Sequence, residues 1–339
     1  MKNAVVLIPS YEPDDLLVNT ITELVENDFP ILLVNDGSGP EFDRVFDKVK
    51  PIVKYLAFEK NKGKGAAMKY GYSQLLDLYP EAKYVITADG DGQHSLKDII
   101  RVYDKLEETN QLVFGVRTFG KDVPFRSRFG NDFSKTTRSL LTKTYIQDDQ
   151  CGLRGFPVRY IPSLLKIKGN RYEYEMNQIV YCQMMQVPMY ALPIETIYLD
   201  SNSRSHFSPF KDTFRIQTII FMHSIAAIIC NLLLIAMLMV GLWHNIMPPI
   251  GVVYISYTIS FLIYFLLLNI FYPTNRFFRR LFKELLFVAI KMETCHGLIF
   301  LTVSILHWTP FAMAPIAVLL CAPLNILFSW LFRKMFPSF

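Results

Sequence analysis

Two long stretches of this 339-residue chain have no charged side chains. No Asp, Glu, Lys or Arg occurs from Ile216 to Asn275, and none occurs from Thr294 to Phe332. A helix that spans a bilayer needs about 20 mostly apolar residues, and both stretches exceed that length. Together with the polar or proline-bearing breaks near them, they predict four transmembrane helices, close to residues 216–242, 249–272, 285–306 and 311–332.

Several motifs of other protein classes are also absent. No G-x-G-x-x-G follows the first apolar run, which weakens a dehydrogenase interpretation, and no G-x-x-x-x-G-K-[ST] occurs for a P-loop. The five cysteines have no C-x-x-C or zinc spacing, so reduced thiols are expected in a cytoplasmic domain. The N-terminal segment carries one Lys and a short apolar run before Pro9, which predicts a strand rather than a signal peptide.

An excess of positive charge is missing from the first two thirds of the chain. Residues 1–215 carry 28 basic and 28 acidic side chains, so the remainder, with seven basic and two acidic, supplies the whole net charge of +5. No nucleic-acid partner is therefore expected. Six of those seven basic residues lie between the second and third predicted helices or after the fourth. By the positive-inside rule, this predicts a multi-pass protein of the cell membrane with both termini in the cytoplasm.

What is present in residues 1–200 is an alternation of apolar runs and helical patterns. The runs are AVVLI, PILLVN, VKYLAF, KYVITA and QLVFGV, and the helical patterns cover 14–26, 41–49, 65–78 and 95–107. This alternation is typical of a doubly wound α/β fold with a mostly parallel sheet. Ligands of such sheets bind at the carboxyl ends of the strands, which here lead into IPSYEP, NDGSG, TADGDGQ and GVRT.

The loop TADGDGQH places Asp89 and Asp91 one glycine apart, directly after an apolar run. One interpretation is an exposed glycine turn whose carboxylates face water. An EF-hand calcium loop is excluded, because His94 stands where that loop needs Gly and Ile100 stands where it needs Glu. The third interpretation is a divalent cation that one or two carboxylates hold and substrate phosphates complete, and the position after a buried strand favours it.

Eight segments resemble, in the same order, those of family-2 glycosyltransferases with the GT-A (Rossmann-like) fold: IPSYEP, VNDGSG, NKGKGAAMKYGY, TADGDGQH, GVRT, RSRFGN, DDQCGLRGF and RYEYEMNQ. The similar branch is that of polyprenyl-phosphate glycosyltransferases, which includes dolichyl-phosphate mannose synthases and bacterial undecaprenyl-phosphate sugar synthases. The resemblance implies a cytoplasmic GT-A domain over 1–207 and a juxtamembrane amphipathic segment at 208–215. Residues 216–339 resemble the four-helix GtrA-like membrane family, which is proposed to move lipid-linked sugars across the bilayer.

The resemblance also implies roles for single residues. Donor nucleotide binding is expected of Pro9, Tyr11, Glu12, Asp36, Lys64, Asp89 and Gly90. The expected ligands of Mg²⁺ or Mn²⁺ are Asp89, Asp91 and Gln93. Acceptor phosphate binding is expected of Arg117, Arg128, Asn131 and His206. The expected catalytic group comprises Asp91, Arg117, Arg128 and Asp148, and the floor of the site comprises Arg154, Glu173 and Glu175.

The residues by themselves leave other roles open for several of these positions. Asp36 is also suited to capping the turn in NDGS, and Lys64 to facing solvent. The arginines also fit a basic helix on anionic membrane lipids. For Glu173 and Glu175, buried ion pairing with Arg154 is the structural alternative.

The activity implied is an inverting, metal-dependent transfer of a sugar from a nucleotide-sugar, with UDP-sugars expected, to a polyprenyl phosphate such as undecaprenyl phosphate. The product would be a lipid-linked sugar for glycosylation of the cell envelope and cell wall. Because the second pKa of a phosphate monoester is near ~6, this acceptor is mostly dianionic at neutral pH and needs no general base. A flippase with a degenerate nucleotide domain and a processive polysaccharide synthase are the alternatives. The resemblance is also compatible with a homo-oligomer of this chain.

Overall fold

The structure is a computed structural model that describes most of the chain. The described residues are 1–117, 151–185, 187–195, 209–244, 248–271, 277–302 and 309–321, with 323, 324, 327 and 331. The chain divides into two compact units. The first contains the β-sheet and the second contains the long apolar helices, and each is described by itself.

Seven strands of the described residues form one mixed sheet in the first unit. They are β1 (Ala4–Ser10), β2 (Ile31–Asn35), β3 (Lys54–Ala57), β4 (Tyr84–Thr87), β5 (Leu112–Arg117), β6 (Arg154–Pro157) and β7 (Met189–Ile194). Their order across the sheet is β3-β2-β1-β4-β6-β5-β7. Strand β6 runs antiparallel to β4 and β5, and the other neighbours pair in parallel. This parallel-dominant sheet confirms the predicted α/β class.

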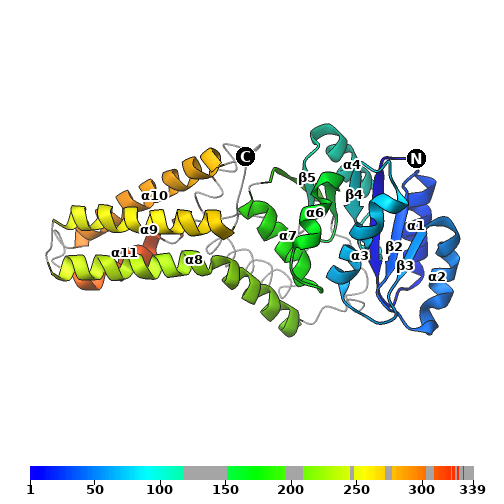
Figure 1. Cartoon of the computed structure of the whole chain (residues 1–339), viewed down its shortest axis with the longest axis horizontal. Coiled ribbons are helices and arrows are strands. Elements are labelled where there is room, and N and C mark those ends of the chain that lie inside the picture. Colours follow the sequence, from blue (N-terminus) through cyan, green and yellow to red (C-terminus); the bar gives the residue numbers. More distant parts are fainter. Residues whose placement is uncertain are drawn as a thin grey trace. The chain divides into compact units, whose positions relative to one another are not determined.

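Helices cover both faces of this sheet (Figure 1). Those of the first unit are α1 (Asp15–Glu26), α2 (Asp43–Val49), α3 (Lys64–Leu78), α4 (Leu96–Thr109), α6 (Ile161–Lys166) and α7 (Glu173–Met184), with short 3-10 helices at Pro40–Phe42, Lys50–Ile52 and Val158–Tyr160. Ala4, Val6 and Ile8 of β1 share one apolar cluster with side chains of α1, α2 and α4. Since strand side chains alternate between faces, the intervening residues of β1 face the layer of α3. The sheet is thus wound on both sides, as the alternating pattern predicts.

The two strands that the sequence pattern does not reveal are β6 and β7. Strand β6 has only four residues, RGFP, and it carries both Gly and Pro, which are depleted in strands. It forms because it pairs with β4 on one side and with β5 on the other. Tertiary pairing therefore overrides local preference at β6.

The second unit is helical. Its elements are α9 (Pro249–Phe271), α10 (Phe277–Phe300), α11 (Pro310–Cys321) and the part of α8 (Pro209–Trp243) from Thr218 onward. Helix α8 runs without a break through the predicted juxtamembrane segment, and α10 begins at Phe277 rather than near residue 285. Within the described residues, two segments are long and apolar enough to cross a membrane, Ile225–Trp243 and Pro249–Ile270.

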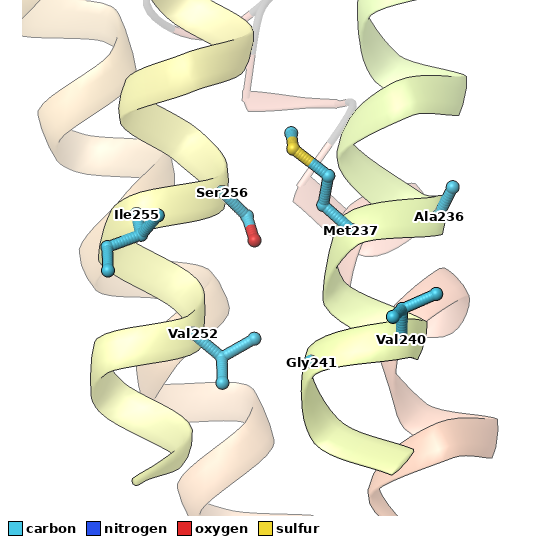
Figure 2. A pocket seen from close by; sticks show the side chains of 7 residues that line it. All are labelled: Ala236, Met237, Val240, Gly241, Val252, Ile255 and Ser256. Atoms are coloured by element: carbon cyan, nitrogen blue, oxygen red, sulfur yellow. The ribbon is translucent and has the colours of Figure 1, made fainter. Parts of the chain in front are cut away.

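Helices α8 and α9 approach each other closely at one point (Figure 2). A Cβ atom on Gly241 would lie 2.5 Å from Val252 Cγ1, so glycine allows the contact. The pocket beside it is lined by Ala236, Met237, Val240, Gly241, Val252, Ile255 and Ser256. Close approach at a small residue is a common way for apolar helices to pack.

Candidate active site

The carboxyl ends of four parallel strands meet at one edge of the sheet. Ser10 of β1 is in register with Asn35 of β2, and Leu7 of β1 is in register with Thr87 of β4. Strand β5 runs in the same direction as β4, because β6 is antiparallel to both. The polar loops after β1, β2 and β4 and the end of β5 at Arg117 therefore lie at this edge, where ligands of such sheets bind.

The carboxylate of Asp36, which is 2% exposed, organises the glycine-rich loop before α3. It accepts hydrogen bonds from the backbone N–H of Lys62 at 2.8 Å and of Gly63 at 2.8 Å, and from Asn61 Nδ2 at 3.1 Å. Burial raises the pKa of Asp36, although the two backbone N–H groups oppose the rise. The turn in NDGS is capped by Asn35, whose Oδ1 accepts from Ser38 N–H at 2.8 Å.

The loop after β1 is tied to the loop after β2. The backbone N–H of Glu12 donates to Ser38 Oγ at 2.9 Å, and Glu12 has a φ of 50°, in the left-handed region. A hydrogen bond with Glu12 raises the pKa of Tyr11, and burial adds to the rise. Pro9 lies within β1 and pairs with Val34. These contacts place the predicted nucleotide-binding residues of both loops beside one another.

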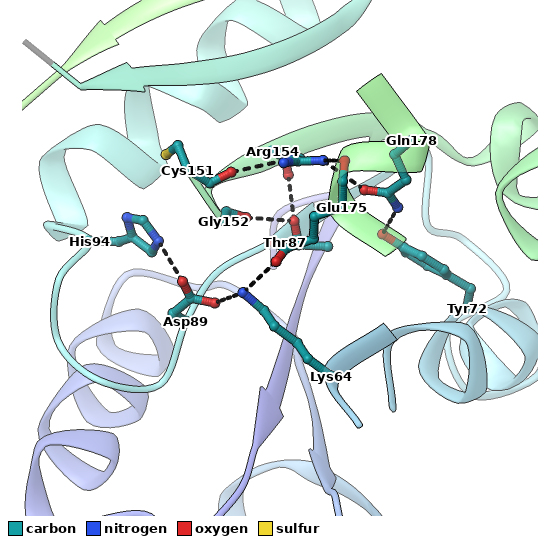
Figure 3. A network of polar contacts seen from close by, with 10 residues as sticks. All are labelled: Lys64, Tyr72, Thr87, Asp89, His94, Cys151, Gly152, Arg154, Glu175 and Gln178. Atoms are coloured by element: carbon teal, nitrogen blue, oxygen red, sulfur yellow. Dashed lines mark hydrogen bonds and ion pairs between the residues drawn. The ribbon is translucent and has the colours of Figure 1, made fainter. Parts of the chain in front are cut away.

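Lys64, the first residue of α3, connects the loop after β4 to α7 (Figure 3). Its Nζ lies 2.7 Å from Asp89 Oδ1 and 3.0 Å from Glu175 Oε2. The other oxygen of Asp89 lies 3.4 Å from Nε2 of His94, which is buried. Lys64 thus contacts two carboxylates. Its side chain does not simply face solvent, which was the predicted alternative.

The charges in this cluster stabilise one another. Burial alone would raise the pKa of Asp89, but Lys64 and His94 hold it well below its ordinary value. Burial alone would lower the pKa of Lys64, and the charges of Asp89 and Glu175 raise it above its ordinary value instead. Both side chains are therefore ionised near neutral pH.

Two members of the cluster have polar atoms without a hydrogen-bond partner. Glu175 Oε1 is buried without a hydrogen-bond partner, and Nδ1 of His94 is buried without one as well. Buried polar atoms are paired in most proteins, so unpaired ones call for an explanation.

Asp91 differs from Asp89 in its surroundings. Its Oδ1 accepts the backbone N–H of Gln93 at 3.0 Å, which is an interaction within the loop. Burial raises the pKa of Asp91, and the nearby charge of Asp89 raises it further. Gly90, between the two acids, packs against Leu17 and Ile8. A partly buried carboxylate without a cationic neighbour as close as the one at Asp89 suits a divalent cation, which would relieve both unfavourable effects.

The described residues contain no cluster of three or more His, Cys, Asp or Glu side chains arranged to hold a metal ion. A cation at Asp91 would therefore have fewer than three such side chains as ligands within the described residues. This is the usual situation for Mg²⁺, which is bound through one or two carboxylates and substrate phosphates. The Asp91 carboxylate therefore fits a divalent cation that takes its other ligands from elsewhere.

Arg154, which is 1% exposed, holds together segments next to the cluster. It donates to the backbone carbonyl of Cys151 at 3.0 Å, to that of Glu175 at 2.6 Å and to Gln178 Oε1 at 3.0 Å. Its guanidinium lies over the ring of Phe114 at 5.4 Å. Arg154 thus joins the start of β6 to α7.

Because Gly152 has no side chain, there is room beside it for the Asp89 carboxylate. A Cβ atom at this position would lie 2.5 Å from Asp89 Oδ2. The Gly152 carbonyl accepts a hydrogen bond from Thr87 Oγ1 at 2.9 Å, which holds the segment against the end of β4. A side chain at residue 152 would displace the Asp89 carboxylate.

The two acids at the start of α7 have different roles. Glu173 Oε1 accepts the backbone N–H groups of Asn170 and Arg171 at 3.0 and 3.2 Å, so it caps the helix. Glu175 contacts Lys64 through its carboxylate and Arg154 through its backbone carbonyl. The carboxylate of Glu175 therefore pairs with Lys64, and not with Arg154 as the alternative predicted.

Sequence reasoning assigned no role at the site to His94, Thr87 or Gln178. His94 is part of TADGDGQH, Thr87 ends the strand before it, and Gln178 follows Glu175 by three residues on α7, so the helical period could have indicated it. Four predicted site residues lie outside the described residues: Arg128, Asn131, Asp148 and His206.

One family model matches the part of the chain that forms this sheet. Residues 5–165 match the model of glycosyl transferase family 2. The matched part contains β1 to β6 with the Lys64 and Asp89 pair.

Two relatives and one solved structure illustrate the similarity. The UDP-N-acetylglucosamine–dolichyl-phosphate N-acetylglucosaminyltransferase of Methanococcus voltae is 25% identical over 216 residues, which is 57% of this chain and 85% of that protein. The undecaprenyl-phosphate 4-deoxy-4-formamido-L-arabinose transferase of an Enterobacter species is 30% identical over 172 residues, 47% of this chain and 50% of that protein. Glucosyl-3-phosphoglycerate synthase from Mycobacterium tuberculosis, solved with Mn²⁺, UDP and phosphoglyceric acid, is 14% identical with a TM-score of 0.47, covering 65% of this chain and 76% of that one.

Proposed function

We propose that the chain is an inverting glycosyltransferase that moves a sugar from a nucleotide-sugar, of the UDP class, to undecaprenyl phosphate or another polyprenyl phosphate. The observation that carries the proposal is the contrast between the two acids of TADGDGQH. Lys64 neutralises Asp89, whereas Asp91 lies at the carboxyl edge of the sheet without such a counter-ion. In a family-2 domain, that arrangement suits a metal and a donor diphosphate.

The donor nucleotide would lie across the loops after β1 and β2. Tyr11 and Glu12 come from the first loop, and Asp36 anchors the second to the glycine-rich loop before α3. Asp91, with Gln93 beside it, would hold Mg²⁺ or Mn²⁺. The metal would offset the charge that develops on the diphosphate as it leaves. Asp36 then acts indirectly, by fixing the loop that closes the nucleotide site.

The acceptor would bring its own nucleophile. A polyprenyl phosphate is mostly dianionic at neutral pH, so the protein has to position its oxygen rather than remove a proton. Arg117, at the end of β5, lies at the same edge as Asp91 and offers a planar fork for phosphate oxygens. Arg128, Asn131, Asp148 and His206 are proposed to complete this part of the site. Attack on the face opposite the leaving nucleotide would invert the anomeric carbon.

The second unit is proposed to anchor this chemistry at the cytoplasmic face of the cell membrane. Support comes from the two segments long and apolar enough to cross a membrane, and from relatives named for dolichyl and undecaprenyl phosphate. With all four apolar helices in the bilayer, the basic start of α10 around Arg279 and both termini would be cytoplasmic. The unit would also help to move the lipid-linked product across the bilayer.

Two other functions predict different behaviour. A flippase with a degenerate nucleotide domain would have no need of the Lys64 and Asp89 pair, and a processive polysaccharide synthase would extend its product. Undecaprenyl phosphate would be incubated with the purified full chain, Mg²⁺ or Mn²⁺, and a panel of UDP- and GDP-sugars. We expect a lipid product with one sugar, and loss of that product in Asp91→Asn. Absence of product with every donor, or full activity in Asp91→Asn, would refute the proposal.

A further inference from the structure

Glu175 has one carboxylate oxygen that the protein leaves unpaired. The residue is 7% exposed, its Oε2 contacts Lys64 at 3.0 Å, and its Oε1 is buried without a hydrogen-bond partner. A buried acceptor without a donor is unfavourable, and such atoms persist where a ligand or a water supplies the missing donor. Oε1 therefore indicates a group that arrives from outside the described residues.

The position of Glu175 limits what that group is. Its carboxylate and that of Asp89 contact the same Lys64 Nζ (Figure 3). Asp91 follows Asp89 by two residues in the same loop. Gly152, on the other side of Asp89, presents no side chain to the carboxylate. The unpaired oxygen consequently lies in the cluster next to the proposed diphosphate site.

Charge limits the group further. Lys64 Nζ has two carboxylates within 3.0 Å, so its single positive charge is already shared between them. A phosphate would offer acceptors where Oε1 needs a donor. A sugar hydroxyl is a neutral donor of the required kind. The donor substrate carries several hydroxyls directly beside its diphosphate.

We propose that Glu175 Oε1 accepts a hydrogen bond from a hydroxyl group of the donor sugar, and that Lys64 holds the Glu175 carboxylate in place for this contact. The inference rests on the proposed function, because it assigns the sugar of that reaction to this cluster. Glu175 would then be a specificity-determining residue, and Lys64 a positioning residue that acts through it and through Asp89.

The test pairs substrate changes with protein changes. The UDP- or GDP-sugar that the wild-type chain transfers fastest is compared with its available 2-, 3-, 4- and 6-deoxy analogues by kcat/KM. In the wild type, we expect one deoxy position to lower kcat/KM roughly 10- to 100-fold, since a hydrogen bond to a charged acceptor is lost. In Glu175→Met, which removes both oxygens with little change in volume, the parent sugar and that analogue should differ by less than about 3-fold.

Matched variants separate recognition from folding. Glu173→Gln alters a helix cap two residues before Glu175. This variant should keep the full wild-type penalty at that deoxy position. Glu175→Gln serves if Glu175→Met melts early, because a neutral amide oxygen is a weaker acceptor and the penalty should shrink. Lys64→Met should shrink the same penalty, and Lys64→Arg should restore part of it.

The outcomes distinguish this inference from the function on which it rests. A wild-type chain that forms no lipid-linked sugar from any donor refutes the proposed function. An active wild type refutes only the inference in two cases: when no deoxy analogue costs more than about 3-fold, or when a folded, active Glu175→Met keeps the wild-type penalty. A penalty that disappears in Glu175→Met but not in Glu173→Gln supports it.

Discussion

Lys64 Nζ and Asp89 Oδ1 lie 2.7 Å apart, at the start of a helix and just after the end of a strand. This pair distinguishes Asp89 from Asp91, two acids that look equivalent in the sequence. Asp89 has an internal counter-ion, and Asp91 has only a backbone N–H of its own loop among the hydrogen-bond donors described above. The pair also joins α3 to the loop after β4, so its integrity is expected to control both the stability and the geometry of the site.

Replacing Lys64 with Met should destabilise the first unit, because it leaves two partly buried carboxylates without their shared cation. Breaking such a pair by removing one partner costs about 3–5 kcal/mol when it is fully buried, so a loss of roughly 3 kcal/mol is expected here. Thermal unfolding of the full chain measures the effect. Lys69→Met on the same helix is the control, since Lys69 Nζ contacts the neutral Asn170 at an exposed position.

Adding Asp89→Asn to Lys64→Met should recover part of the lost stability, because the unpaired charge is removed. Equal melting temperatures for Lys64→Met and Lys69→Met would show that the pair contributes nothing.

Acid should weaken the fold through Asp89. The neighbouring Lys64 and His94 hold the pKa of Asp89 well below its ordinary value in the folded state, despite burial that acts to raise it. The stabilisation is therefore complete above the unfolded-state pKa of about 3.9, and it is lost progressively as the pH falls below that value. Melting temperatures of the wild type and Asp89→Asn between about pH 6 and pH 2 measure the effect. The curve of the variant should be flatter below about pH 4, and parallel curves would contradict the assignment.

Gly152→Ala should impair catalysis more than stability. The added Cβ would lie 2.5 Å from Asp89 Oδ2, which forces the carboxylate out of its contact with Lys64 or His94. A displacement of this size near reacting groups lowers kcat/KM by roughly 10- to 100-fold, while the fold loses about 1–3 kcal/mol. Gly297→Ala is the control, because nothing lies within 4 Å of its added Cβ. A Gly152→Ala enzyme with wild-type kcat/KM would show that Asp89 can move freely.

Glycine substitutions at Glu12 and Asp28 can separate the cost of backbone strain from an effect on substrate binding. Glu12 and Asp28 both have positive φ, at 50° and 63°, which costs a non-glycine residue about 1 kcal/mol. Glycine at either position should therefore leave stability unchanged or raise it by up to about 1 kcal/mol. Only Glu12→Gly should also raise KM for the nucleotide-sugar, since only Glu12 lies in the loop at the carboxyl edge. An equal KM in Glu12→Gly and Asp28→Gly would remove Glu12 from the donor site.

Much of the first unit follows from local pattern. The alternation of apolar runs and helical periods predicts β1 to β5 and the four helices between them, and the structure has all of these elements. Helix ends follow from local chemistry as well: Asp14 caps α1, and Ser95 caps α4. Strands β6 and β7 are different, because β6 forms through pairing with strands distant in the sequence.

The order of motifs in the sequence was sufficient to indicate a family-2 glycosyltransferase domain and to locate the acids of TADGDGQH at a sheet edge. These features depend on short-range pattern, which a sequence carries directly. The partner of each acid depends on contacts between segments far apart in the chain. Only the tertiary structure assigned Lys64 to Asp89 and Glu175, attached Asp36 to the loop before α3, and left one oxygen of Glu175 unpaired. Burial and long-range pairing determine these relationships, and neither can be deduced from the spacing of residues along the sequence.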